Sequence, residues 1–141
     1  MAEQATVADK PVPAHLMKGV IPYISLNGAA AAADFYKKAF GAVEHRRLPA
    51  DDGKRLMHCH LEINGGSLML GDAFDEHGYG WQPSHSFTMT LVVDDIDAWF
   101  KRAVDAGCAV TQPVELMFWG DRYGSVKDPF GVDWAMNSPT K

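Results

Sequence analysis

The stretch RLMHCHLEIN, residues 55–64, alternates between apolar and polar side chains. Such alternation predicts a β-strand with two unlike faces, because successive side chains of a strand point to opposite sides of a sheet. One predicted face is apolar enough to pack on a helix: Met57, Cys59, Leu61 and Ile63. The other face carries three titratable groups: His58, His60 and Glu62. Titratable groups are a costly filling for a closed core, so we expect this second face to line a binding cavity.

The residues around this strand predict the remaining elements. Asn64 and Gly65 favour a tight type I′ turn, because both tolerate the left-handed backbone that this turn needs. An alanine-rich segment predicts a helix over 29–40, ended by Gly41, and Asp94 or Asp95 is placed to cap a second helix that ends at Gly107. The predicted strands are residues 19–26, 42–48, 55–64, 67–70, 87–93, 108–114, 118–127 and 132–137.

The two halves of the chain repeat one order of elements. Residues 35–40 match residues 99–104, and the turn at Gly131 follows the turn at Gly65 by 66 positions. Each half is predicted as a strand, a helix and three strands. Since neither half buries its sheet face alone, we expect one curved sheet system around a shared interior.

Composition narrows the class of protein. The chain has 141 residues, 47% of them hydrophobic, and a formal net charge of −5 without a basic stripe. This excludes nucleic acid and anionic membrane surfaces as expected partners. No apolar run approaches the length of a membrane span, and the N-terminus has no hydrophobic signal region. Cys59 and Cys108 form no C-x-x-C pattern, so we expect buried, reduced thiols and a cytoplasmic protein.

Five motifs carry a family resemblance: IPYISLNG (21–28), DFYKKAFGA (34–42), HCHLEINGGSLML (58–70), VDDIDAWFKRAVDAG (93–107) and WGDRYGSVKDPFGVDW (119–134). The chain resembles the vicinal oxygen chelate superfamily of glyoxalases, extradiol dioxygenases and bleomycin-resistance proteins, most of all its PhnB-like branch. The resemblance implies an α+β fold of paired βαβββ modules, a curved mixed sheet with a concave cavity, and often a homodimer. We therefore expect a flexible N-terminal tail (1–17), module 1 (18–72), an inter-module loop (73–84) and module 2 (85–138), with 18–138 forming one structural domain.

Metal-dependent members of this superfamily hold a divalent ion at four strand positions. Those positions fall here on four residues that are poor ligands: Ile21, Met69, Thr88 and Ala135. The resemblance therefore implies a cavity without the family metal and argues against a glyoxalase I activity through that ion. A displaced ion at His58 and His60 stays open, because side chains about 7 Å apart along a strand converge on one ion. Glu62 lies roughly 13 Å from His58, too far to be an easy third ligand.

The same alignment assigns the side chains that face the cavity. The expected ligand-binding residues are Tyr23, His58, His60, Glu62, Thr88, Thr90, Trp119 and Arg122. Arg122 shares the parity of His58 under the 66-residue shift, so it either enters the cavity or lies on the surface beside Asp121 or Glu115. Trp119 is either a stacking platform for a flat ligand or a packed edge residue. His60 and Glu62 are the best catalytic candidates, and the alternative is a set of hydrogen bonds inside a polar cavity.

Two hypotheses emerge for the function. The first is a glyoxalase- or bleomycin-resistance-like protein that binds a small organic ligand, without metal or other cofactor, as a homodimer. The second is a small lyase or dioxygenase that uses a displaced metal site or acid–base chemistry of His60 and Glu62. The sequence does not decide whether the protein is an enzyme, and the poor ligands at the family's metal positions favour the binding protein.

Overall fold

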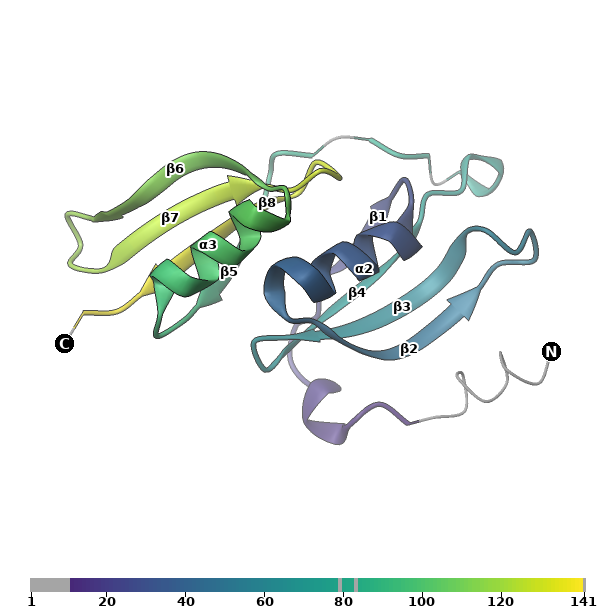
Figure 1. Ribbon diagram of the computed structural model, residues 1–141. Coiled ribbons are helices and arrows are strands. Elements are labelled where there is room, and N and C mark those ends of the chain that lie inside the picture. Colours follow the sequence, from purple (N-terminus) through teal and green to yellow (C-terminus); the bar gives the residue numbers. More distant parts are fainter. Residues whose placement is uncertain (1–10, 79, 83, 141) are drawn as a thin grey trace. The chain divides into compact units, whose positions relative to one another are not determined.

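The computed structural model describes residues 11–78, 80–82 and 84–140. These residues form two compact units, one of residues 11–37, 41–78 and 80–82, the other of residues 38–40 and 84–140. Each unit holds a four-stranded mixed sheet, and a helix accompanies each sheet (Figure 1). The predicted α+β fold of two βαβββ modules is confirmed. A cavity shared by both modules stays a prediction.

The first sheet has the strand order β1-β4-β3-β2, in which β1 pairs parallel with β4 and the other pairs are antiparallel. Two short 3₁₀ helices, η1 and η2, precede and follow the module. The elements in chain order are η1 (Ala14–Leu16), β1 (Tyr23–Leu26), α2 (Ala29–Phe40), β2 (Val43–Pro49), β3 (Leu56–Ile63), β4 (Gly66–Asp72) and η2 (Asp75–His77).

Local chemistry explains where these elements begin and end. Asn64 has φ 52° and Gly65 has φ 80°, as the predicted turn between β3 and β4 requires. Helix α2 ends as predicted at Gly41, whose φ is 67°. The carboxylate of Asp72, at the end of β4, accepts hydrogen bonds from the backbone N–H groups of Gly28 and Ala29 (2.8 and 3.0 Å) and so caps the start of α2.

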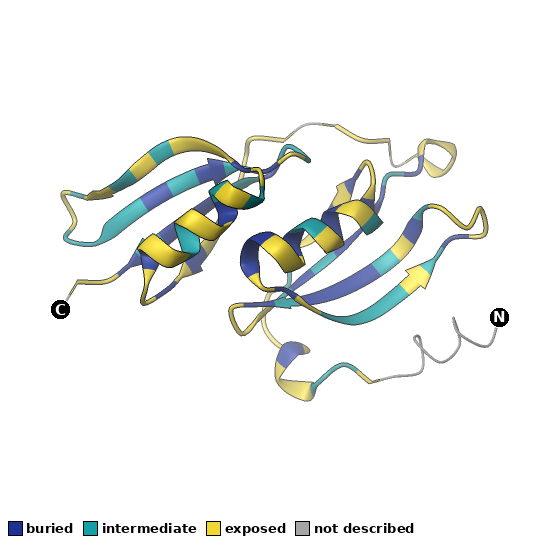
Figure 2. Cartoon of the chain, viewed as in Figure 1, coloured by how far each residue is buried: buried dark blue, intermediate teal, exposed yellow. Residues whose placement is uncertain are grey.

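The core of the first unit lies between α2 and one face of its sheet. Cys59, Leu61 and Ile63 are buried, as the alternation predicted, and the central strands β3 and β4 are the most buried of the sheet (Figure 2). Met57 is the exception, because 46% of it is exposed. The pairing of β2 with β3 shifts register between Leu48 and Pro49, which interrupts the alternation at the start of β3 and buries Leu56 instead.

The second sheet has the strand order β5-β8-β7-β6, again with one parallel pair, β5 with β8. The carboxylate of Asp95 accepts a hydrogen bond from the backbone N–H of Ala98 (3.2 Å), which identifies Asp95 as the cap of the second helix. The elements are β5 (Met89–Val92), α3 (Ile96–Ala106), β6 (Ala109–Leu116), β7 (Arg122–Lys127) and β8 (Asp133–Ser138).

The two modules differ by one residue in the register of their last hairpin. In the first module, Leu70 of β4 pairs with Cys59 of β3. The equivalent residue of β8, Met136, lies 66 positions after Leu70. Its partner Gly124, however, lies only 65 positions after Cys59. The predicted turn at 128–131 is present, with the N–H of Gly131 donating to the carbonyl of Asp128 (3.2 Å). It is part of a longer connection than the Asn64–Gly65 turn. As a result, residues of β7 match residues of β3 with a shift of 65, and the expected shift of 66 is wrong for this strand.

Several predicted boundaries also change. Strands β1, β5 and β7 begin later than predicted, at Tyr23, Met89 and Arg122. In the predicted tail, residues 1–10 lie outside the described residues, while Ala14–Leu16 form η1 and Leu16 is 2% exposed. The carbonyl of Leu16 accepts a hydrogen bond from the Ser67 hydroxyl (2.7 Å), so this part of the chain belongs to the first module.

Both cysteines are free and buried. Burial raises the pKa of each thiol to about 12. Within the part of the chain that the structure describes, neither helix has the length and apolar character needed to cross a lipid bilayer.

Candidate functional site

The side of the first sheet that faces away from α2 collects polar groups, and we call it the polar face. It is built by strands β1 to β4, and its side chains alternate with the buried residues that pack on α2. Its members with functional groups are Tyr23, His45, Arg46, His58, His60, Glu62 and Ser67. The face predicted from residues 55–64 therefore exists, with two additional basic residues.

Tyr23 and His58 form a partly exposed ring pair on this face. Their ring centroids are 5.7 Å apart and the rings are tilted by 30°. The Tyr23 hydroxyl donates to the carbonyl of Met57 (2.8 Å), which means that the side chain reaches from β1 across β4 to β3. Gly71 of β4 allows this crossing, because a Cβ there would come within 2.9 Å of the Tyr23 oxygen. Burial, and then the charge of Arg46, lowers the pKa of His58, which favours its neutral form.

His60 lies deeper than its neighbour, with 1% of it exposed. Its Nε2 is 2.8 Å from the Ser67 hydroxyl. That hydroxyl has one proton and donates it to the carbonyl of Leu16, so it accepts from a protonated Nε2 of His60. Burial, and then His58, lowers the pKa of His60. The Ser67 hydroxyl thus bonds η1 to the sheet and His60 orients that hydroxyl, so Nε2 of His60 is not free to bind a metal or a ligand.

Glu62 also has a partner. Its Oε1 accepts a hydrogen bond from Nε2 of His45 at 2.8 Å. His45 comes to this face through a β-bulge: Glu44 pairs with Leu61 and Arg46 pairs with His60, so that two residues of β2 oppose one of β3. The neighbours Glu44 and Arg47 are bonded to each other and to residues of α2 on the opposite side of the sheet.

The donors at the family's four metal positions do not suit a divalent ion. Ile21 and Ala135 have no donor atom in the side chain, and Met69 and Thr88 offer a thioether and a hydroxyl. Within residues 11–78, 80–82 and 84–140, no three His, Cys, Asp or Glu side chains gather in a way that could hold a metal ion. The residues present at these four positions therefore do not fit the metal that related enzymes use.

The expected inward orientation of Arg122 is wrong. Its guanidinium makes two hydrogen bonds to the carboxylate of Asp97 in α3, at 2.8 and 3.0 Å. The cause is the one-residue change of register described above, which turns Arg122 to the helix side of the second sheet. Its partner is neither Asp121 nor Glu115, the two carboxylates suggested by the sequence.

The other predicted residues of the second unit are exposed. Thr88 precedes β5 and Thr90 lies within it. Trp119 is 46% exposed and makes an edge contact with Tyr123, at 5.6 Å between ring centroids. Tyr123 alternates with Arg122 and so lies on the side of the sheet away from α3. Trp119 therefore belongs to an aromatic cluster with Phe118 and Tyr123 and remains a candidate stacking surface.

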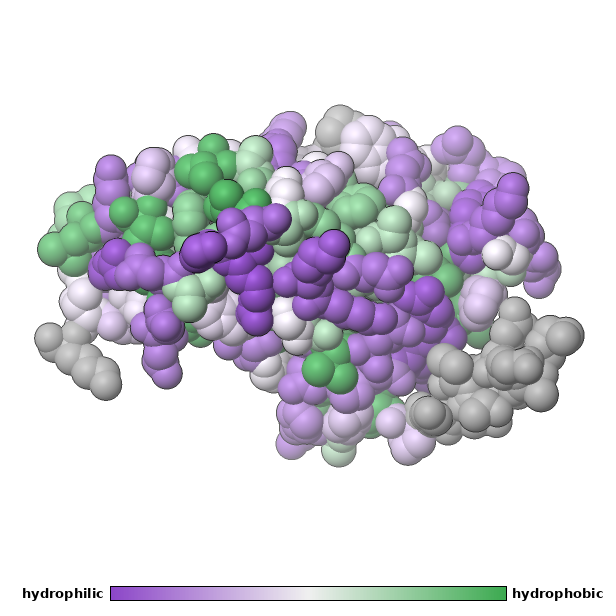
Figure 3. All heavy atoms as spheres, viewed as in Figure 1, coloured by the Kyte–Doolittle hydropathy of each residue, from purple (hydrophilic) through white to green (hydrophobic). Residues whose placement is uncertain are grey.

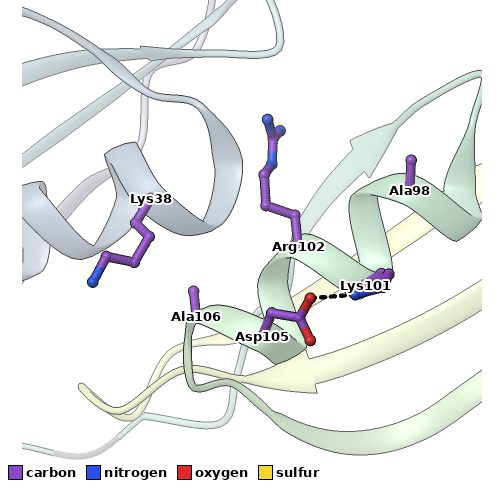
Figure 4. Close-up of a pocket in the computed structure, with 6 residues that line it drawn as sticks. All are labelled: Lys38, Ala98, Lys101, Arg102, Asp105 and Ala106. Atoms are coloured by element: carbon purple, nitrogen blue, oxygen red, sulfur yellow. Dashed lines mark hydrogen bonds and ion pairs between the residues drawn. The ribbon is translucent and has the colours of Figure 1, made fainter.

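Two of the cavities among the described residues are lined by no residue of the polar face. One, of about 440 Å³ in the second unit, is lined by basic and small side chains, and Lys101 there is bonded to Asp105 (Figure 4). Its lining residues are Lys38, Ala98, Lys101, Arg102, Asp105 and Ala106. The other, of about 400 Å³, lies at the β2–β3 turn of the first unit, around Asp52, Arg55 and Phe74. The candidate site is thus defined by side-chain chemistry and not by cavity volume.

Sequence reasoning missed His45 and Arg46. Strict alternation places two consecutive residues on opposite faces, and only the bulge in β2 brings both to the polar face. The run of basic residues at 45–47 was the available signal, but it does not say which of them shares a face with His60.

Comparison with known proteins gives a consistent picture. Residues 14–136 match the model of the family described as the Glyoxalase/Bleomycin resistance protein/Dioxygenase superfamily. The Mycobacterium bovis protein Mb0911c is 44% identical over 126 residues, covering 85% of this chain and 82% of that protein. The crystal structure of PA1353 from Pseudomonas aeruginosa has a TM-score of 0.72 at 27% identity, covering 88% of this chain and 99% of the other. TnmS3, an antibiotic binding protein from Streptomyces, has a TM-score of 0.65 at 26% identity, with coverage of 87% and 97%.

Proposed function

Since the chain belongs to the glyoxalase/bleomycin resistance protein/dioxygenase superfamily, we propose that it is a binding protein for a small organic ligand and works without the family metal. The polar face of the first sheet is the proposed site. Tyr23 and His58 would contact the ligand, whereas the buried His60 has a structural role through its hydrogen bond to Ser67.

The observation that carries this proposal is the Tyr23–His58 ring pair. Both rings are accessible in part, and Tyr23 is 51% exposed although its hydroxyl is fixed by the Met57 carbonyl. A fixed aromatic pair gives a flat ligand a large contact surface at a low cost in conformational entropy. The description of TnmS3 as an antibiotic binding protein supports binding as the role of this fold in a relative.

A thermal-shift screen tests the proposal. The purified chain is heated with a panel of aromatic and amphiphilic compounds in the presence of EDTA, and separately with divalent ions alone. We expect an increase in melting temperature with an organic compound under EDTA, because a ligand that binds only the folded state stabilises it. A shift with divalent ions and with no organic compound would contradict the proposal.

Two variants locate the site of any compound that binds. Replacing Tyr23 with Leu removes the ring and its hydrogen bond, and replacing His58 with Ala removes the second ring; either should weaken binding by about tenfold or more. His77→Ala is the matched control, because His77 is an exposed histidine of η2 outside the polar face. Equal loss in all three variants would place the ligand elsewhere.

The enzymatic alternative has one observation in its favour, the His45–Glu62 hydrogen bond of 2.8 Å. A carboxylate fixed by a histidine is the arrangement of a general base with an orienting partner. If this pair abstracts protons, a ketone or aldehyde that binds should exchange its α-hydrogens with D₂O faster with the protein than without it, as measured by NMR. Glu62→Gln should abolish that acceleration, and the absence of any acceleration would reject this alternative.

We also propose that the protein is a homodimer. Large apolar side chains of the second unit are exposed, among them Leu116 (69%) and Phe118 (97%), and apolar surface gathers near the loop that joins β6 to β7 (Figure 3). Such surface in a protein of this size favours association. Sedimentation equilibrium should give twice the monomer mass of 15.5 kDa, and Phe118→Ser should shift the equilibrium toward monomer.

A further inference from the structure

We propose that Arg46 and His58 form an anion-binding subsite on the polar face, which holds a carboxylate or another oxyanion of the ligand. This inference rests on the proposed binding function and assigns the ligand to a chemical class. It concerns residues of the first unit only.

Strand pairing puts Arg46 on the polar face. Arg46 lies directly opposite His60 in the antiparallel pairing of β2 with β3, and opposed residues project to the same side of a sheet. Arg47, the next residue, projects to the other side, where it bonds Glu44 at 2.8 and 3.0 Å and approaches Asp34 of α2. The bulge at residues 45 and 46 thus separates two adjacent arginines onto opposite faces of one strand.

Arg46 differs from the other arginines in having no partner. All five arginines of the chain are among the described residues, and four of them donate hydrogen bonds: Arg47 to Glu44, Arg55 to Asp52 and Glu76, Arg102 to the carbonyl of Ala39, and Arg122 to Asp97. Within residues 11–78, 80–82 and 84–140, Arg46 has no hydrogen bond or ion pair, although it is only partly exposed. A half-buried guanidinium without an acceptor has donors to offer to a ligand.

The surroundings of Arg46 favour an anion. Arg46 lies opposite His60 and diagonally across from His58, whose own partner in β2 is Leu48. Burial lowers the pKa of both histidines, and the charge of Arg46 acts in the same direction on each. The carboxylate on this face, Glu62, already accepts a hydrogen bond from His45. A ligand carboxylate would take two hydrogen bonds from the guanidinium and a third from the neutral imidazole of His58.

The same face offers an apolar contact beside the charge. His58 also contacts the ring of Tyr23, so a ligand with an aromatic ring attached to an acid group would satisfy both. The predicted class is therefore an aromatic or otherwise flat carboxylate, and the neutral amide of the same shape should bind more weakly.

The experiment compares 1-naphthoate with 1-naphthamide, which share a ring system and differ in charge. Titration calorimetry at pH 7.5 should give an affinity for naphthoate at least about tenfold higher, since hydrogen bonds from a guanidinium to a charged carboxylate are stronger than those to a neutral amide. Arg46→Gln should reduce the affinity for naphthoate to that for naphthamide. Arg46→Lys should retain part of the preference for naphthoate over naphthamide, because lysine keeps the positive charge but cannot make the bidentate hydrogen bonds of a guanidinium.

Arg47→Gln is the matched control, since it removes the same charge from the same strand on the opposite face. Equal losses in Arg46→Gln and Arg47→Gln would show long-range attraction only and would overturn the subsite. Equal affinities of the unmodified chain for the two compounds would overturn the subsite and leave the binding function intact. If neither compound binds and the wider panel gives no thermal shift, both proposals fail.

Discussion

Among single side chains, Arg122 and Asp97 make an ion pair that is structural. The Arg122 guanidinium lowers the pKa of the Asp97 carboxyl, and both groups lie at the surface of the second unit. We predict that Arg122→Met leaves ligand affinity unchanged and lowers the urea midpoint only slightly, because exposed ion pairs are screened by water. Calorimetry with the ligand found in the screen, beside urea unfolding, measures both quantities. A loss of affinity in Arg122→Met would restore this residue to the site.

His58 and His60 predict how stability depends on pH. Burial lowers the pKa of each below that of an unfolded histidine, which is about 6.5. As the pH falls through about 6.5, the unfolded chain takes up protons before the folded chain does, so stability falls until the lower folded pKa is passed. Urea unfolding at pH 7.5 and 5.5 should show this loss. The loss should be smaller in His60→Gln, and an equal loss there would show that His60 is not responsible.

The polar face shows what alternation can and cannot predict. His58, His60 and Glu62 share a face, as their spacing in the sequence indicated. Alternation fails where one residue is added to a strand or a turn: the bulge in β2 moved His45 to the face, and the longer turn before β8 moved Arg122 away from its predicted face. The pattern of hydrophobic residues in the sequence reveals neither irregularity. A bulge or a longer turn changes which residues pair across the sheet, and it does not change the order of residue types along the chain.

Among strands, the close passage of Tyr23 over β4 makes Gly71 critical. A Cβ at Gly71 would lie 2.9 Å from both the Tyr23 hydroxyl oxygen and the Met57 carbonyl oxygen, whereas a Cβ at Gly66 of the same strand would meet only the Ile63 carbonyl, at 3.7 Å. We predict that Gly71→Ala lowers the free energy of unfolding by about 1–3 kcal/mol and weakens ligand binding. Gly66→Ala is the control and should be near neutral in urea unfolding. Equal effects of the two substitutions would argue against a fixed Tyr23.

Helices and strands differ in how well their limits can be predicted from the sequence. Helix α2 matches its prediction over its full length, since its alanine run and Gly41 are local signals. The predicted starts of β1, β5 and β7 are too early, because a strand begins where its partner begins and that partner is distant in sequence. The role of Asp72 was missed for the same reason, as it caps a helix more than 40 residues away.

For the chain taken together, residues before the first strand are an integral part of the first unit. Leu16 is 2% exposed, and its carbonyl completes the chain of hydrogen bonds through Ser67 to His60. We predict that Leu16→Ala lowers the free energy of unfolding by about 2–4 kcal/mol, as for other buried leucines. Met17→Ala, next in sequence and 54% exposed, should have little effect. Chemical denaturation measures the free energy of unfolding of both variants. Equal values for the two would mean that the packing of η1 contributes little to the stability of the first unit.

The buried thiols give each unit its own kinetic probe. Cys59 lies in β3 of the first unit and Cys108 lies immediately before β6 of the second. A thiol with a pKa of about 12 has almost no reactive thiolate at neutral pH while the protein is closed. Alkylation by iodoacetamide, followed by mass spectrometry of the peptides that contain Cys59 and Cys108, therefore measures the rate at which each unit opens locally. Added ligand should slow the modification of Cys59, and the rate at Cys108 would tell whether that protection spreads along the chain.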